Sequence, residues 1–257
     1  MNPLRYFPVA LLLLAGCVQP PVAEKPKESA PPAARQPAAD EPQTASHRHR
    51  KHRNRQRQDS PEPETTSKTE PGTFDFFVLS LSWSPQYCAS PAGANDRVQC
   101  ARPFDFVLHG LWPQYEGQGW PQDCDTTRVD QAIVDSMLDI MPSPRLVIHE
   151  WKKHGTCSGH DAKEYFEDAR DAFQSIKIPA PYKQPKAQVI ANPAQMRQQF
   201  VQANPKLKED DIAVLCSGRY LQEVRVCLSK DFEPRPCNRE VLRDQCKLDE
   251  IILKPVR

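Results

Sequence analysis

The chain has 257 residues, among them 27 prolines and 9 cysteines, and a formal net charge of +1 at neutral pH. This balance excludes a uniformly basic or acidic protein, so a polyanionic partner would have to bind at a local cluster of basic residues. Residues 18–71 contain no Phe, Trp, Tyr, Leu or Ile, which excludes a hydrophobic core in that segment. Folded structure is therefore expected downstream.

The first 17 residues are typical of a bacterial lipoprotein signal. Arg5 precedes an apolar run from Phe7 to Leu14, and the LAGC segment that ends at Cys17 is typical of the site where such signals are cut and lipidated. The run is too short to cross a bilayer about 30 Å thick as a helix. We expect an exported protein, periplasmic or at the cell surface, that is lipid-anchored to a bacterial membrane through Cys17. An ordinary secretory signal or a short membrane anchor is the alternative.

Residues 18–72 are expected to form a disordered, Pro-rich tether. Within it, residues 47–57 contain six Lys or Arg and three His but no acidic residue. Such a stretch can bind RNA phosphates or anionic lipid headgroups, or it can remain solvated without a specific partner. The folded domain is expected to cover residues 73–257.

The pattern of apolar residues in this domain favours an α+β fold. Dense aromatic and aliphatic content predicts strands at residues 74–83, 104–109, 212–215 and 223–228, the second of which is expected to end at Gly110. Helical periodicity predicts helices at residues 128–141, 162–176 and 193–203. Apart from Cys17, eight cysteines remain, and an even number in an exported domain predicts four disulfides.

Two short segments contain three of the four histidines of the domain. Residues 106–113 (FVLHGLWP) include His109, and residues 149–157 (HEWKKHGTC) include His149 and His154. A zinc-protease helix needs two histidines four residues apart on one face. His149 and His154 are five apart and would point roughly 140° away from each other on a helix, so no metal site is expected.

On that helix, the pairs that share a face are His149 with Lys153 and Glu150 with His154. We expect Glu150 to orient His154 and to raise its pKa, while Lys153 and His149 present positive charge to phosphate oxygens. Cleavage of RNA by attack of its own 2′-hydroxyl needs one group that accepts the proton of this hydroxyl and another that donates a proton to the departing 5′-oxygen. Histidine suits both tasks because its unperturbed pKa of about 6.5 leaves both protonation states available.

Together the two segments resemble the two active-site signatures of the ribonuclease T2 family, and residues 76–88 (FFVLSLSWSPQYC) are similar to the family's first strand. The resemblance extends from about residue 74 to at least residue 246. It implies an α+β fold with a central antiparallel sheet, flanked by helices and stapled by disulfides. It also implies a metal-independent endoribonuclease without a cofactor that cuts single-stranded RNA through a 2′,3′-cyclic phosphate to a 3′-phosphate end. We expect a monomer that acts on RNA.

Carried onto this sequence, the resemblance implies that His109 and His154 are the acid-base pair, with either one as the base. It implies that Glu150 and Lys153 stabilise the pentacovalent transition state and that His149 binds phosphate. The disulfides it implies are Cys88–Cys100, Cys124–Cys157, Cys216–Cys246 and Cys227–Cys237.

The resemblance also implies that Trp112 stacks on a base, with help from Tyr115; the alternative for Trp112 is a packing role in the core or at its rim. Gln114 occupies the position where some members have an acidic base-reading residue, so their base preference is not transferred. Trp151 is expected to pack into the core and His160 to lie at the surface.

Two other functions compete with a ribonuclease. The first is a lipid-tethered binding protein of the same fold that has lost activity, and the complete set of expected catalytic residues argues against it. The second is a periplasmic metallohydrolase, which would need a second set of ligands that the domain lacks.

Overall fold

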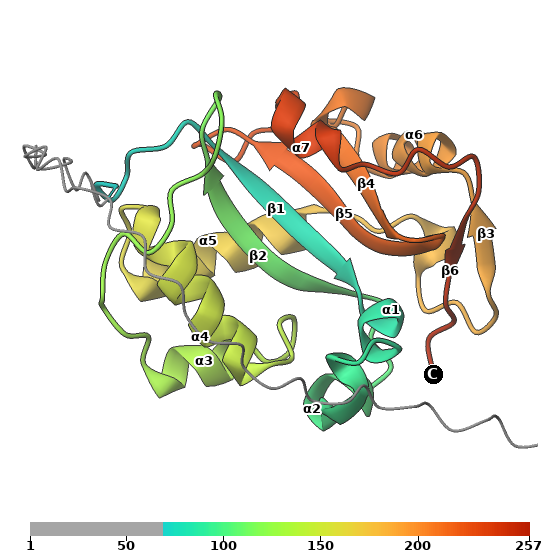
Figure 1. Cartoon of the computed structure of the whole chain (residues 1–257), viewed down its shortest axis with the longest axis horizontal. Coiled ribbons are helices and arrows are strands. Elements are labelled where there is room, and N and C mark those ends of the chain that lie inside the picture. The colour runs from blue at the N-terminus through green and yellow to red at the C-terminus, as the bar shows by residue number, and fades with distance from the viewer. Residues whose placement is uncertain (1–68) are drawn as a thin grey trace, which may run out of the picture. The chain divides into compact units, whose positions relative to one another are not determined.

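The computed structural model describes residues 69–257, and Figure 1 labels their helices and strands. Cys17, the tether and the basic stretch at residues 47–57 lie outside the described residues. The strands are β1 (Phe76–Trp83), β2 (Phe106–Gln114), β3 (Val189–Ala191), β4 (Ile212–Ser217), β5 (Tyr220–Leu228) and β6 (Ile251–Leu253). The helices are α1 (Ser84–Cys88), α2 (Arg97–Cys100), α3 (Gln131–Met137), α4 (Pro144–Lys153), α5 (Ala162–Ser175), α6 (Pro193–Ala203) and α7 (Arg239–Arg243).

Six strands form one sheet in the order β2-β1-β5-β6-β3, and β4 pairs with β5 off this path. The pairs β1–β2, β1–β5, β4–β5 and β3–β6 are antiparallel. Strands β5 and β6 are parallel and meet at Tyr220 and Ile252. The fold is therefore α+β, as the resemblance implied, with one parallel contact in a sheet that is otherwise antiparallel.

One face of the sheet carries the main hydrophobic core. Side chains alternate between the two faces along a strand, and on β1 the residues Phe77, Leu79, Leu81 and Trp83 face this core. They pack in one cluster with buried residues of α3, α4, α5 and α6, and Figure 1 shows α3, α4 and α5 gathered beside and behind β2. Burial of one such side chain contributes about 1.5–3 kcal/mol, so this face holds the sheet to its helices.

The opposite face is apolar at one end and polar at the other. Phe76 and Val78 of β1 join a smaller cluster with Cys227 and with Val241 of α7. Further along β1, the residues that follow on the same face are serines, at positions 80 and 82. The candidate site lies at this polar end.

Most predicted elements are found close to their expected positions. The helix expected at residues 193–203 is α6, and the one expected at 162–176 is α5, one residue shorter. The helix expected at 128–141 is confined to residues 131–137. The expected end of the second strand at Gly110 is wrong, because β2 continues through this glycine to Gln114. Helices α1 and α2 and strands β3 and β6 were not anticipated, since each has five residues or fewer.

Four disulfides staple the domain, and they join the same pairs that the resemblance implied: Cys88–Cys100, Cys124–Cys157, Cys216–Cys246 and Cys227–Cys237. The Cys124–Cys157 bridge anchors the turn that follows α4 to the loop after β2. A bridge of this kind contributes on the order of 2–4 kcal/mol. This one also fixes the end of the helix from which site residues project.

Candidate active site

His109 is the extra residue of a β-bulge in β2. Ser80 of β1 pairs with Gly110 and Leu81 pairs with Leu108, so His109 has no partner in the ladder. Leu108 and Leu111 both belong to the main core, although they are three positions apart. The two residues between them, His109 and Gly110, therefore face the polar side in succession. Bulges often re-aim a side chain in this way beside an active site.

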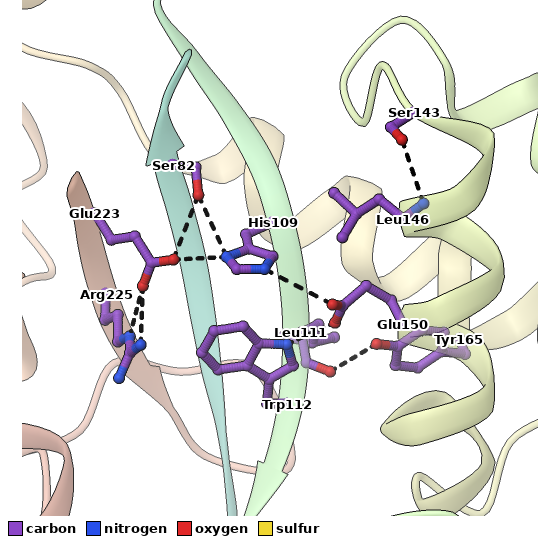
Figure 2. A network of polar contacts seen from close by, with 10 residues as sticks. All are labelled: Ser82, His109, Leu111, Trp112, Ser143, Leu146, Glu150, Tyr165, Glu223 and Arg225. Atoms are coloured by element: carbon purple, nitrogen blue, oxygen red, sulfur yellow. Dashed lines mark hydrogen bonds and ion pairs between the residues drawn. The ribbon is translucent and has the colours of Figure 1, made fainter. Parts of the chain in front are cut away.

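Two glutamates flank the imidazole of His109, as Figure 2 shows. Its Nδ1 is 2.6 Å from Oε1 of Glu223 on β5, and its Nε2 is 3.9 Å from Oε1 of Glu150 on α4. Ser82 of β1 donates from Oγ to the same Glu223 oxygen at 3.4 Å. A carboxylate only accepts hydrogen bonds, so Nδ1 carries the proton that Glu223 accepts. The Nε2 atom is left as the ring nitrogen directed at Glu150.

Three residues, His109, Ser82 and Arg225, donate hydrogen bonds to Glu223 although it is buried. Arg225, two residues further along β5, donates to its Oε2 from Nε at 3.0 Å and from Nη2 at 2.9 Å. Burial alone would raise the pKa of Glu223, but the hydrogen bond and charge of His109 and the charge of Arg225 outweigh it and lower the pKa to about 2. Glu223 is therefore a stable carboxylate at neutral pH.

The same carboxylate changes the titration of His109. Burial lowers the pKa of the imidazole, but the hydrogen bond to Glu223 and the charges of Glu223 and Glu150 outweigh that effect, so the pKa is raised above its ordinary value. Because one third of the side chain is exposed, solvent still reaches the ring. His109 is thus favoured in its protonated form.

Glu150 makes a different set of contacts from the one expected. Its Oε2 accepts a 2.6 Å hydrogen bond from Nε1 of Trp112, and among the described residues no hydrogen bond or ion pair joins it to the side chain of His154. Burial raises the pKa of Glu150 to about 7, against the opposing charge of His109 and the Trp112 hydrogen bond. The expectation that Glu150 orients His154 and raises its pKa is therefore wrong.

Trp112 explains why the side chains of Glu150 on α4 and His154, just after α4, do not meet. Its ring centroid is 5.5 Å from that of His154 and 5.1 Å from that of His109, so the indole contacts both imidazoles while its Nε1 binds Glu150. A Cβ atom at position 110 would overlap Glu150 Oε2 and Trp112 Nε1. Gly110 is thus required for the close approach of the carboxylate and the indole.

Local sequence fixes where α4 begins and ends. Ser143 is its N-cap and accepts a hydrogen bond from the backbone N–H of Leu146, and Pro144 occupies the first position. The helix ends at Lys153, and a short turn at residues 155–157 follows. Gly155 begins this turn because a side chain there would overlap Trp151 and Tyr165. His154 is therefore set between the helix end and a tightly packed turn.

The environment of His154 contrasts with that of His109. Burial, followed by the charges of Lys153, His149 and His109, lowers the pKa of His154 to about 3. Its Nδ1 is buried without a hydrogen-bond partner among the described residues.

The ring of His154 lines a cavity of about 280 Å³. We call it the histidine cavity, and its walls also include Val78, Trp112, Lys153 and Arg225.

Several other residues singled out in the sequence do not line the histidine cavity. His149 is exposed, does not line the histidine cavity, and has its pKa lowered by burial and by the charge of Lys153. Tyr115 is partly buried and packs against the main core, outside the cavity wall. Trp151 packs in the core beside Tyr165, as expected. His160 lies at the surface, as expected, and forms an ion pair with Asp168 at 2.8 Å.

Sequence reasoning missed Ser82, Glu223 and Arg225. Glu223 and Arg225 alternate with valines in a strand that is otherwise largely buried. Charged residues are almost never buried unless they are paired. Two opposite charges on the same face of a predicted central strand were therefore a signal that could have identified this pair.

Neither a cluster of metal ligands nor a membrane-spanning helix is found in the part of the chain that the structure describes. Within residues 69–257, no three His, Cys, Asp or Glu side chains are grouped so that they could hold a metal ion. In the same part of the chain, no helix has the length and apolar character needed to cross a membrane.

The chain is similar in sequence to known ribonucleases. Residues 74–237 match the family model described as the ribonuclease T2 family. The chain is 34% identical over 216 residues to a ribonuclease of Aeromonas hydrophila, and the match covers 74% of this chain and 90% of that protein.

Two solved structures share the fold. An RNase-related protein from Calystegia sepium matches with a TM-score of 0.58 and 20% identity, over 72% of this chain and 98% of that one. The structure of RNase NT in complex with 5′-AMP matches with a TM-score of 0.52 and 24% identity, over 71% of this chain and 98% of that one.

Proposed function

The chain belongs to the ribonuclease T2 family, and from this premise we propose that it cleaves single-stranded RNA by transesterification without a metal ion. In the first step the 2′-hydroxyl of the substrate loses its proton to a base and its oxygen bonds to the adjacent phosphorus. The bond from phosphorus to the 5′-oxygen breaks, and that oxygen takes a proton from an acid. The product is a 2′,3′-cyclic phosphate, which water then opens to a 3′-phosphate.

We assign the base to His154 and the acid to His109. The observation that carries this assignment is the opposite surroundings of the two rings. Burial and the neighbouring cation of Lys153 lower the pKa of His154, so its ring is neutral and has an unprotonated nitrogen for the proton of the 2′-hydroxyl. His109 lies between the carboxyl groups of Glu223 and Glu150 with a raised pKa, which keeps it protonated and able to donate from Nε2.

Three neighbouring groups complete the proposed mechanism. Lys153 lines the histidine cavity beside His154, where its charge would stabilise the extra negative charge of the pentacovalent phosphorus. Glu150, with a pKa of about 7, can offer the phosphate a proton in its neutral form and stabilise protonated His109 in its anionic form. Trp112 would stack on a base from the cavity wall. His149 is exposed and its lowered pKa favours the neutral ring, so it would bind phosphate through an N–H donor.

The proposal is tested by incubating the full-length protein with single-stranded RNA in excess chelator and identifying the product ends. We expect 2′,3′-cyclic phosphates early and 3′-phosphates late, at a rate that the chelator does not change. DNA and 2′-O-methyl RNA should remain intact because they lack the nucleophile. Cleavage of DNA at the rate of RNA, or 5′-phosphate products, would refute the mechanism.

The N-terminal sequence supports a separate proposal, that the mature protein is exported and lipid-anchored through Cys17. Fractionation of cells that express the full chain should recover it with membranes, and Cys17→Ser should release it or block its processing. Recovery of the wild-type protein in a soluble fraction, with an unmodified mature N-terminus well beyond residue 17, would contradict the proposal.

A further inference from the structure

A second cavity, which we call the distal cavity, opens at the end of β1. Its volume is about 360 Å³, and its walls include Ser84, Arg102, Phe104, Tyr220, Lys254 and Arg257. These residues come from α1, from the segment before β2, from the start of β5 and from the chain after β6. Figure 1 shows α1 and the C-terminal end of the chain near each other at this end of the sheet.

The distal cavity combines positive charge with aromatic rings. Lys254 Nζ lies 4.5 Å from the centroid of the Tyr220 ring, and Arg102 Cζ lies 4.6 Å from that of Phe104. No acidic side chain lines the cavity. The guanidinium of Arg102 donates to two backbone carbonyls, of Val98 and Leu138.

The positive charges of this cavity are not neutralised by neighbouring carboxylates. Within residues 69–257, the ten ion pairs include none formed by Arg102, Lys254 or Arg257. Arg102 and Lys254 form no ion pair there, and each lies over a partly buried aromatic ring. Cationic side chains beside aromatic rings are the combination that proteins use to bind single-stranded nucleic acid. The cavity is therefore suited to a phosphate with an attached base.

The histidine cavity, His109 and the distal cavity follow one another along β1 and the first residue of α1. Val78 lines the histidine cavity, Ser82 contacts His109 at 3.3 Å, and Ser84 lines the distal cavity. Residues two apart at the end of a strand are separated by at most roughly 7 Å, which is comparable with the reach of one nucleotide in an extended nucleic-acid strand. The distal cavity thus begins about one nucleotide beyond the imidazole, on the side away from the histidine cavity.

The distal cavity also opens on the face of the sheet that carries the site. On β5, Leu221 and Val224 face the main core. The irregular register opposite β4 leaves Gln222 as an extra residue between Leu221 and Glu223. Tyr220 and Glu223 therefore project to the same, polar face, and Lys254 covers the Tyr220 ring there.

We propose that the distal cavity binds the nucleotide adjacent to the cleaved dinucleotide, with Lys254 and Arg102 contacting its phosphate and Tyr220 or Phe104 its base. The inference rests on the proposed function, because it takes His109 as the position of the cleaved phosphate. It predicts that adding one nucleotide to a dinucleotide substrate makes cleavage more efficient. Only one of the two possible extensions, at the 5′ or at the 3′ end, should have this effect.

The test compares full-length wild-type protein with Lys254→Gln. The substrates are a dinucleoside monophosphate and the same dinucleotide extended by one nucleotide at its 5′ or its 3′ end. In the wild type, one extension should raise kcat/KM. In Lys254→Gln this advantage in kcat/KM should shrink about threefold. In a plot of log advantage against log salt concentration, the slope should be shallower by about 0.7 than in the wild type, which is the contribution of one phosphate contact.

The control is Lys206→Gln, which removes one positive charge from an exposed lysine paired with Glu233, outside both cavities. It should keep the full advantage of the longer substrate. The inference is overturned if Lys254→Gln also keeps that advantage for both extensions, or if it lowers cleavage of the dinucleotide and trinucleotides by the same factor.

Failure of the proposed function would look different, because the wild type would then cleave none of the three substrates. In that case the distal cavity is tested by binding alone. A 2′-O-methyl trinucleotide, which offers no nucleophile, should bind Lys254→Gln about threefold more weakly than the wild type and Lys206→Gln. Equal affinities of all three proteins would overturn the inference.

Discussion

Successive side chains of β1 and β5 point to opposite faces of the sheet, one apolar and one polar. On one side Leu79 and Val226 are fully buried in the main core, and on the other Ser82 and Glu223 meet around His109. Both sets are held by one hydrogen-bonded ladder, in which Leu79 pairs with Val226 and Ser82 pairs with Glu223. A shift of one residue would exchange the two faces. Packing on the apolar face therefore determines where the polar groups point.

A second lesson comes from the two glutamates on either side of His109. Both are almost completely buried, with 2% of each residue exposed. Glu223 receives two hydrogen bonds from Arg225 and one each from His109 and Ser82, and its pKa is lowered to about 2. Glu150 receives one neutral donor, from Trp112, and its pKa is raised to about 7. Burial is the same, so the number and charge of the donors decide the direction.

The largest effect expected on the polar face is the loss of either histidine. His109→Ala or His154→Ala should lower kcat on RNA by about 10²–10⁴-fold, the usual share of general acid-base catalysis. The double variant should lose much less than the product of the two losses, because the residues act as a pair. Initial rates with purified variants measure this. Wild-type rates in both single variants would remove the assignment of the two roles.

The corresponding change on the apolar face is Leu79→Ala. It should lower the free energy of unfolding by about 2–5 kcal/mol through lost burial and an unfilled cavity, as measured by urea titration. The fraction that remains folded should keep the wild-type pH dependence of kcat. A changed pH dependence would mean that the two faces are less separate than their contacts indicate.

A smaller effect should come from Glu223→Gln, which keeps an acceptor for His109 but removes the charge. Because that charge raises the pKa of His109, the variant should lose its protonated acid at lower pH than the wild type. The alkaline limb of kcat should move to lower pH, with about a tenfold loss near neutral pH and little loss near pH 5.

The matched control is Glu233→Gln, since Glu233 is exposed and pairs with Lys206. It should leave the pH profile unchanged. A uniform loss at all pH values in Glu223→Gln would indicate a structural role only. Stability gives an independent readout: the lowered pKa of Glu223 contributes stability that is present above its ordinary value of 4.5 and lost as pH falls towards 2. The variant should lack this acid-dependent part.

Much of the site could be predicted because its residues lie in two contiguous segments. His109 and Trp112 share one segment, and Glu150, Lys153 and His154 share the other, so short-range pattern was sufficient. Helix spacing also predicted that Glu150 and His154 face the same side. It could not predict that Trp112 of β2 would donate a hydrogen bond to the Glu150 carboxylate.

The parts that could not be predicted depend on contacts between distant segments. Glu223 is 114 positions from His109, and no local pattern connects them. Gly110 was interpreted as the end of a strand because glycine commonly interrupts strands. Its role depends on Glu150, which reaches it from α4. Short elements such as β6 are stabilised by sheet pairing and have too few residues for a periodic signal.

The bulge at His109 has a consequence for length variation in β2. Deleting one residue between Leu108 and Leu111 would remove the register shift between β2 and β1. The two strands could then pair residue by residue without an extra residue in β2. The shortened strand would contain one residue at the point where there are now two. Either the imidazole or the glycine that admits the Glu150 carboxylate would be missing. We therefore expect the more regular strand to be less active, because it would lack either the proposed acid or the close approach of the Glu150 carboxylate.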